Sequence, residues 1–178
     1  MGTPEFAVPA LAAVARSGEV VAVVTQPDRP QGRGLALEPS AVARRAVELH
    51  LPVIKSANPN DESTRRALAA LEPDFFVVVA FGAILGAELL AVPRLGAINL
   101  HGSLLPDYRG AAPVQRALWD GRTVTGVTTL WMDQGIDTGD TILRLEVPIS
   151  NDDNAGTLAT RLAERGAPLL SESLTLAH

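Results

Sequence analysis

The stretch that decides the fold is FFVVVA, from Phe75 to Ala80, which follows the turn-forming pair Pro73-Asp74. It is aromatic and β-branched and has no polar alternation, a pattern typical of a strand buried on both faces. Two further runs, VVAVVT from Val20 to Thr25 and GAINL from Gly96 to Leu100, have the same character. Together they predict a mostly parallel sheet that is covered on both sides by helices.

Amphipathic segments separate these strands along the chain. We predict helices over Glu5 to Arg16, over Ser40 to His50 and over Asp61 to Leu71, the last two beginning at capping-type residues. Alternation of strands and helices indicates an α/β, Rossmann-like fold with a mostly parallel sheet flanked by helices.

The pattern changes after residue 121. Thr123 to Met132 and Asp140 to Ile149 alternate more strongly and are separated by a Gly/Asp turn. We predict that they form an antiparallel pair closing one side of the sheet, and that Asn154 to Leu176 forms a terminal helix.

The start of the chain departs from the usual order of an α/β domain. Gly2-Thr3-Pro4 leads directly into the first predicted helix, although such a turn normally follows a strand. We therefore expect a central first strand to be missing, which leaves two strand edges exposed.

Composition narrows the class of protein. The 178 residues fit one domain, and the absence of cysteine excludes disulfides and thiolate metal sites. A net charge of −5 argues against nucleic-acid binding by this chain alone. The three histidines are scattered at 50, 101 and 178, so we predict no metal site. Without a signal-peptide pattern or a span long enough for a bilayer, we expect a cytoplasmic monomer that does not associate with membranes.

The densest chemical candidate is the pair Asn99 and His101 at the end of the third strand. Residues two apart on a strand share a face, and ligands of open α/β sheets bind beyond the carboxyl ends of the strands. Histidine is suited to proton transfer near neutral pH, and an Asn amide is suited to stabilising an oxyanion. The alternative interpretation is that both side chains only satisfy the strand end.

Three loops surround this pair in the predicted fold. Ser103 to Pro113 is a long Pro- and Gly-punctuated segment that enters a helix at Pro113. Asp133 to Asp140 carries three carboxylates around two glycines, which is compatible with a cation site, with a plain turn, or with an Asp that orients His101. Gln26 to Gly34 carries two arginines suited to phosphate contacts, or is an exposed turn. The spacing indicates an Asn/His/Asp enzyme of acyl or one-carbon transfer.

The order N-x-H, S-L-L-P, R-G-x-x-P and D-x-G-x-D-x-G-D, found between Asn99 and Asp140, resembles the folate-dependent formyltransferase family. This resemblance covers essentially the whole chain. It implies a formyltransferase catalytic domain over 1–178 that uses 10-formyltetrahydrofolate as formyl donor. It also implies that Asn99, His101 and Asp137 are the catalytic set.

The same resemblance implies the binding residues. The family's folate-binding segments match Phe81 and Gly82 after the FFVVVA strand, and Ser103, Leu104, Leu105 and Pro106 after the GAINL strand. Within the family, TQPDRPQGRG from Thr25 to Gly34 is similar to the branch that formylates initiator methionyl-tRNA for translation initiation. This similarity implies that Arg29 and Arg33 approach the tRNA.

Two departures keep other functions open. The family's first strand and its C-terminal OB-like, tRNA-contacting domain have no counterpart in this sequence. The alternatives are a formyltransferase acting on a sugar amine or a ribonucleotide amine, a formyl-folate hydrolase, or an inactive fragment that only binds folate.

Overall fold

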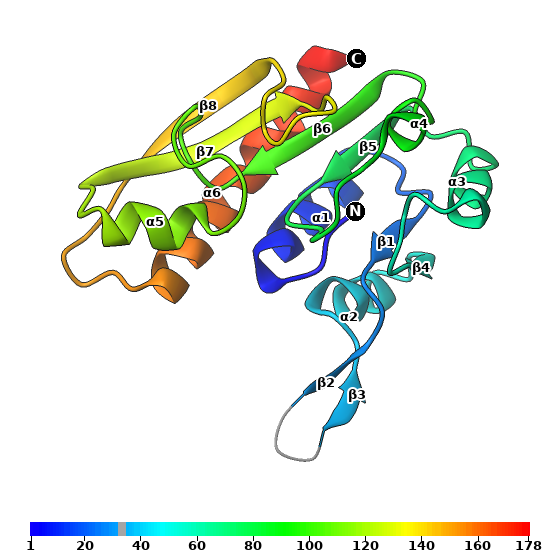
Figure 1. The fold of residues 1–178 in the computed structure, drawn as a ribbon, viewed down its shortest axis with the longest axis horizontal. Coiled ribbons are helices and arrows are strands. Elements are labelled where there is room, and N and C mark those ends of the chain that lie inside the picture. The colour runs from blue at the N-terminus through cyan, green and yellow to red at the C-terminus, as the bar shows by residue number, and fades with distance from the viewer. Residues whose placement is uncertain (32–34) are drawn as a thin grey trace.

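The structure, a computed structural model, describes residues 1–31 and 35–178 and has an α/β architecture (Figure 1). A four-stranded sheet has the order β5-β6-β7-β8, and a separate parallel pair is formed by β1 and β4. β5 and β6 are parallel, whereas β7 is antiparallel to both β6 and β8. The strands are β1 (Val23–Thr25), β4 (Val53–Lys55), β5 (Phe75–Val78), β6 (Gly96–His101), β7 (Val124–Trp131) and β8 (Thr141–Pro148).

Helices form the outer layers, as predicted. A 3-10 turn, η1 (Glu5–Ala7), leads into the first of them, and the α-helices of the described residues are α1 (Val8–Ser17), α2 (Ala41–Glu48), α3 (Glu62–Ala69), α4 (Ala87–Leu90), α5 (Pro113–Trp119) and α6 (Ala155–Ala177). The predicted caps of α2 and α3 are confirmed. The Ser40 hydroxyl accepts from the Ala43 amide at 3.0 Å, and the Asp61 carboxylate accepts from the Thr64 amide at 2.7 Å.

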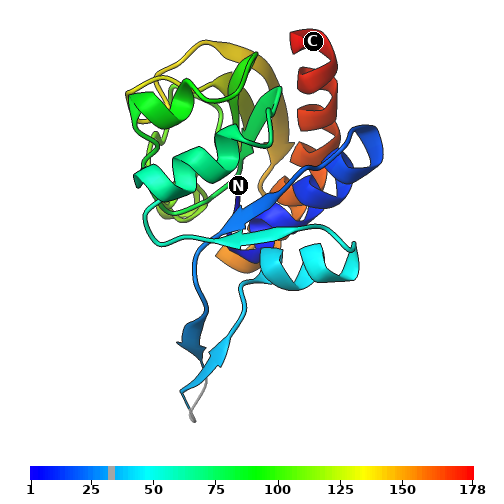
Figure 2. The ribbon, with the colours of Figure 1, turned by 90° about the vertical axis from the view of Figure 1, so that its right-hand side faces the viewer.

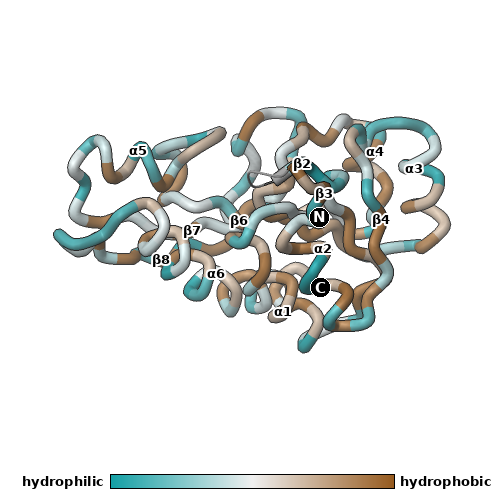
Figure 3. Tube along the Cα trace, turned by 90° about the horizontal axis from the view of Figure 1, so that it is seen from below, coloured by the Kyte–Doolittle hydropathy of each residue, from teal (hydrophilic) through white to brown (hydrophobic). Residues whose placement is uncertain are grey.

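The two faces of the sheets carry separate cores. Because successive strand residues point to opposite faces, Val23 and Ile98 pack on the side of α1, α2 and α6, whereas Val24 and Ala97 pack with Leu68 of α3. Figure 2 shows α1 and α6 together on one side of the strands. Hydrophilic and hydrophobic residues interleave along α6 in Figure 3, as expected for a helix with one buried face.

The predicted α/β fold and its antiparallel closing pair are confirmed. Several short elements were not predicted, among them α4. The arginine-bearing loop contains a hairpin of β2 (Arg29–Gln31) and β3 (Ala36–Glu38), which extends from the body of the molecule (Figures 1 and 2). β4 has only three residues, too few to give a periodic signal.

A gap lies between β1 and β5. Met1 and Gly2 enter it and hydrogen-bond to both sides: the Gly2 amide donates to Val24 O at 3.0 Å, and the Val79 amide donates to Met1 O at 2.9 Å. Gly2 and Val79 form an isolated parallel bridge. In the described part of the chain, no strand fills the rest of the gap, so β1 and β5 each keep one unpaired edge there.

A cavity of about 130 Å³ occupies this gap. Apolar side chains line it, including Ala10, Leu11 and Val14 of α1 on one side and Leu68 and Leu71 on the other. Its lining and its place between β1 and β5 therefore suit an extended apolar segment.

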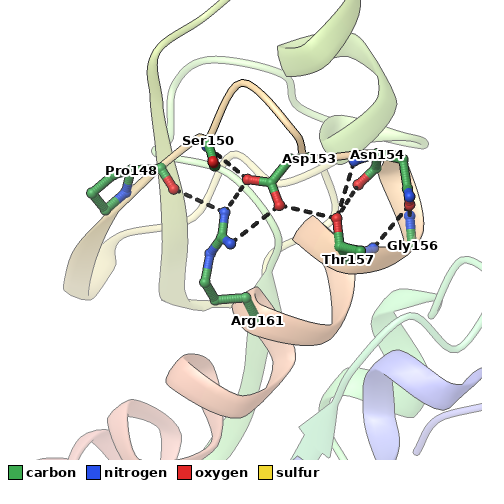
Figure 4. A network of polar contacts seen from close by, with 7 residues as sticks. All are labelled: Pro148, Ser150, Asp153, Asn154, Gly156, Thr157 and Arg161. Carbon is green, nitrogen blue, oxygen red and sulfur yellow. Dashed lines mark hydrogen bonds and ion pairs between the residues drawn. The ribbon is translucent and has the colours of Figure 1, made fainter.

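The polar turn that starts α6 fixes this helix to the end of β8 (Figure 4). The Asn154 side chain caps the helix by accepting from the Gly156 and Thr157 amides at 2.9 and 3.1 Å. In turn, the Thr157 hydroxyl accepts from the Asn154 amide at 3.0 Å. Arg161 pairs with Asp153 and also donates to Pro148 O at 3.0 Å. The hydrogen bond from Arg161 lowers the pKa of Asp153 to about 2.

The Met1 ammonium generates a pH-dependence prediction. It donates to Val77 O at 2.6 Å, and burial lowers its pKa from 8.0 to about 5. Between these values the unfolded chain holds the proton and the folded chain does not, so stability rises with pH from about 5 to 8. Protonation of Met1 therefore destabilises the folded chain below pH 5 by roughly 4 kcal/mol relative to its stability above pH 8. An N-terminally acetylated chain has no ammonium group, so we expect its free energy of unfolding to lack this pH dependence. Urea unfolding of both forms across this pH range checks it, and parallel curves would contradict it.

A second prediction concerns the gap itself. A five-residue β-branched segment added ahead of Met1 should pair with β1 and β5 and fill the cavity. We expect Tm to rise by about 5–10 °C, equivalent to roughly 2–3 kcal/mol for a chain of this size. The matched control carries Asp at alternate positions of the added segment. Equal Tm values for the two extensions would show that the gap does not bind a strand.

Candidate active site

β6 places Asn99 and His101 at the carboxyl end of the sheet. The strand is paired with β5 on one side and with β7 on the other, and the Asn99 Cα lies opposite Val78 and Leu130. Because the two residues are separated by one position, they share a face, as predicted. His101 is buried, with 7% of its surface exposed.

The Asp137 carboxylate joins three segments of the chain. Its Oδ1 accepts from Asn99 Nδ2 at 2.9 Å, and its Oδ2 accepts from the Gly110 amide at 2.8 Å. The same Oδ2 lies 3.4 Å from His101 Nδ1. The structure therefore brings together the three residues that the sequence singled out.

The two ring nitrogens of His101 face different acceptors. Nε2 lies 2.9 Å from the Tyr108 carbonyl oxygen. A carbonyl can only accept, so Nε2 carries a proton in this arrangement. Nδ1 faces the Asp137 carboxylate. The two contacts together fix the orientation of the imidazole ring.

The segment after β6 is held by its own side chains. The buried Ser103 hydroxyl donates to Asp107 O at 2.5 Å, and Thr128 Oγ1 donates to Ser103 O at 2.7 Å. Thr128 Oγ1 also accepts from the Leu105 amide at 3.1 Å. The Ser103 side chain thus shapes the loop.

The other residues of the predicted folate loop differ in exposure. Leu105 is buried and Pro106 is exposed. Leu104 is half-buried and packs on Gly126 of β7, where a Cβ would lie 2.5 Å from Leu104 Cδ2. A side chain at Gly126 would therefore displace Leu104 and the loop. What the loop presents to solvent is its backbone and Pro106.

The second predicted folate segment follows β5. The Phe81 ring is 2% exposed, and Phe81 O accepts from Thr3 Oγ1 at 2.9 Å. Gly82 has φ of 84° and nothing within 4 Å of an added Cβ, so this turn presents open backbone. Since β5 and β6 are parallel neighbours, the two predicted folate segments leave the sheet side by side.

Of the two predicted arginines, Arg29 lies apart from this cluster. Arg29 is exposed on β2, and in the described chain it forms no hydrogen bond or ion pair with Asn99, His101 or Asp137. Arg33 lies outside the described residues. The hairpin nevertheless follows the carboxyl end of β1, which puts it at the same edge of the fold as the end of β6.

Two carboxylates of the Asp133 to Asp140 loop have different roles: Asp133 stabilises the turn, and Asp137 contacts the site. Asp133 Oδ1 accepts from the Gly135 amide at 2.9 Å and from Thr138 Oγ1 at 2.7 Å, an ordinary turn. Asp137 has φ of 52° and faces the site. Within residues 1–31 and 35–178, no three His, Cys, Asp or Glu side chains cluster as metal ligands would.

Two contributors to the site were missed, because both act through the backbone. They are the Tyr108 carbonyl and the Gly110 amide. The sequence signal that could have indicated them is the Tyr-Arg-Gly triplet within the punctuated loop, where Gly110 has φ of 81°.

In the described chain, none of the helices combines the length and the apolar composition needed to cross a membrane.

Comparison with known proteins places this site in context. The formyl transferase domain family matches residues 2–174. The methionyl-tRNA formyltransferase of Stenotrophomonas maltophilia is 51% identical over 175 residues, which cover 98% of this chain and 57% of the relative. The chain thus spans little more than half of that relative's length.

Solved structures share the fold. Phosphoribosylglycinamide formyltransferase of Bacillus halodurans superposes with a TM-score of 0.78 at 25% identity, covering 97% of this chain and 90% of that one. The N-formyltransferase of Helicobacter canadensis, solved with folinic acid and dTDP-3-aminofucose, gives a TM-score of 0.72 at 22% identity, covering 99% and 61%.

The Asp137 contacts generate a prediction. Asp137→Asn keeps the shape of the side chain but loses its charge and one acceptor, so the Gly110 amide loses a charge-assisted hydrogen bond. We expect hydrogen exchange at Gly110 to accelerate about tenfold or more. The matched control is Asp133→Asn in the same loop, which should leave Gly110 unchanged. Equal effects of the two substitutions would contradict the assigned role of Asp137.

Proposed function

Because the chain belongs to the formyl transferase family, we propose that it transfers the formyl group of 10-formyltetrahydrofolate to the amino group of initiator methionyl-tRNA. The observation that carries this proposal is the joining of Asn99, His101 and Asp137 at the carboxyl edge of the sheet. This is the edge at which open α/β sheets bind their ligands.

The three side chains supply what amine formylation requires. Attack of the amine on the formyl carbon forms the new C–N bond and puts negative charge on the formyl oxygen. Asn99 donates one amide hydrogen to Asp137, which leaves the second for that oxyanion. The positive charge of protonated His101, balanced by Asp137, stabilises the same oxygen.

The reaction also needs a proton path. The attacking amine must lose a proton, and the folate nitrogen must gain one as its C–N bond to the formyl group breaks. We assign this path to Nδ1 of His101, beside Asp137, which takes the proton that the amine loses and passes it to the folate nitrogen, while Nε2 keeps its own proton on the Tyr108 carbonyl. Burial of His101 keeps bulk water from competing as an acceptor.

The two turns after β5 and β6 are suited to the donor. A pterin ring is flat with a polar edge, and the open backbone at Gly82 and the exposed loop around Pro106 offer groups that can pair with such an edge. Phe81, Ser103, Leu104 and Leu105 would hold these turns in shape. This division of labour would make backbone geometry, rather than side-chain chemistry, the main determinant of folate binding.

The choice of methionyl-tRNA as acceptor rests on the curated relative and on the arginines. The match to a methionyl-tRNA formyltransferase, 51% identical overall, covers 98% of this chain and so takes in the hairpin region. Arg29 and Arg33 would contact tRNA phosphates at the edge shared with the site. We further propose that the reaction proceeds in the cytoplasm, where translation starts, and that one copy of the chain suffices, because a single chain supplies the whole cluster.

Formylation assays test the proposal. With a 10-formyltetrahydrofolate donor, we expect label transfer to methionyl-tRNA, and Asn99→Ala should lower turnover by roughly 10²–10³-fold. Asn151→Ala, at an exposed turn, is the matched control. Arg29→Ala with Arg33→Ala should raise KM for tRNA and leave KM for the donor unchanged. Preferred transfer to glycinamide ribonucleotide or an amino sugar, or release of free formate, would overturn the choice of acceptor.

A further inference from the structure

The carbonyl that holds His101 belongs to a residue with an unusual backbone. Tyr108 has φ of 57°, in the left-handed region that residues with side chains rarely adopt. Its carbonyl oxygen lies 2.9 Å from His101 Nε2. A different φ at Tyr108 would turn the neighbouring peptide groups away, so the histidine contact requires that this conformation be maintained.

The Tyr108 side chain is bound from two directions. Its hydroxyl donates to Asp120 Oδ2 at 2.8 Å and accepts from Arg122 Nε at 2.9 Å. The Arg122 guanidinium also lies over the ring, 5.7 Å from its centroid. These contacts restrain the position of the ring, and through it the backbone of Tyr108.

Asp120 and Arg122 are themselves placed by α5. The Asp120 amide donates to Arg116 O at 2.9 Å, and the Arg122 amide donates to Ala117 O at 3.0 Å. The other end of α5 lies against the site, because a Cβ on Gly102 would lie 3.6 Å from Pro113 Cγ. The helix thus starts beside His101 and ends at the residues that hold Tyr108.

We propose that Asp120 and Arg122 are positioning residues that act through Tyr108 to keep His101 in one hydrogen-bonded state. Their contacts maintain the left-handed backbone at Tyr108, and the Tyr108 carbonyl then keeps the proton on Nε2 and directs Nδ1 to Asp137. The consequence for turnover rests on the proposed function, whereas the effect on His101 does not.

The alternative is a surface cluster that only stabilises α5. Asp107, which also contacts Arg122, has 55% of its side chain exposed, and exposed pairs of this kind contribute little stability. The two interpretations differ in whether the loss of these contacts changes the hydrogen bonding of the His101 imidazole. A merely stabilising cluster would change Tm without changing the protonation or exchange of the imidazole.

NMR of the 178-residue chain with ¹⁵N-labelled histidine measures this directly. His50 and His178 are exposed and serve as internal references. In the unmodified chain we expect a slowly exchanging Nε2–H signal from buried His101. In Tyr108→Phe, which keeps the ring but loses both hydroxyl contacts, we expect this proton to exchange about tenfold faster or more. Arg122→Ala should also make this proton exchange faster. Arg122→Lys keeps a positive charge and should bring back part of the slow exchange seen in the unmodified chain.

A second pair of variants isolates the backbone conformation. Glycine adopts φ near 57° without strain, whereas alanine does not. Tyr108→Gly should therefore keep more of the His101 signal than Tyr108→Ala, although both remove the side chain. The matched control is Arg116→Ala, an exposed arginine on the same helix. Unchanged Nε2–H exchange in Tyr108→Phe, or equal exchange in the Gly and Ala variants, overturns the proposal.

Formylation kinetics then separate this inference from the proposed function. Tyr108→Phe should lower kcat roughly fivefold with an unchanged KM for the folate donor. If the unmodified chain formylates no amine, the proposed function fails, and the NMR comparison still decides whether Asp120 and Arg122 position His101.

Discussion

The site depends on the confinement of β6. This strand is hydrogen-bonded on both edges and packed on both faces, so its carboxyl end is fixed in every direction except along its axis. The closest restraint comes from α6, where a Cβ on Gly166 would lie 2.9 Å from Leu100 Cδ2. Leu100 lies between Asn99 and His101, so the helix presses on the one position that separates the two site residues. A glycine within a helix lowers helix propensity, and here its small size permits the approach of α6 to β6.

Around this fixed strand end, the site is completed by polar groups of the main chain. Asp137 receives an amide hydrogen from Gly110 as well as from Asn99, and His101 is oriented by a carbonyl of Tyr108. Three of the residues involved, Tyr108, Gly110 and Asp137, have positive φ. Glycine adopts this conformation without strain, but at Tyr108 and Asp137 it persists only where surrounding contacts determine it, and here those contacts are the same ones that build the site. Loop conformation and site geometry are therefore two aspects of one hydrogen-bond network.

This arrangement explains what could be predicted from the sequence. Continuous apolar runs such as Phe75 to Ala80 predicted the buried strands, and the i, i+2 spacing placed Asn99 and His101 on one face. The Asp137 side chain was identified from its motif, but the Tyr108 carbonyl was not, since every residue has a carbonyl and only its φ distinguishes this one. The shortest elements also escaped prediction. β4 is three residues long, and it is a strand because it pairs with β1, which lies about thirty residues earlier in the chain. Local sequence patterns do not encode such a long-range pairing.

The unfilled gap between β1 and β5 divides the molecule unequally. Within residues 1–31 and 35–178, the hydrogen bonds and the ion pair of the His101 and Asp137 side chains come from β6, the loop before α5 and the loop after β7, which belong to the closed four-stranded half. The β1 half contributes the arginine-bearing hairpin, and it meets the other half through Met1 and Gly2, α1 and the helices that pack on it. Loosening at the gap would thus shift the hairpin relative to the site while leaving the internal geometry of the cluster intact. The groups that we propose for catalysis and the hairpin that carries Arg29 therefore lie in different halves of the molecule, and the contacts of Met1, Gly2 and α1 set the relation between them.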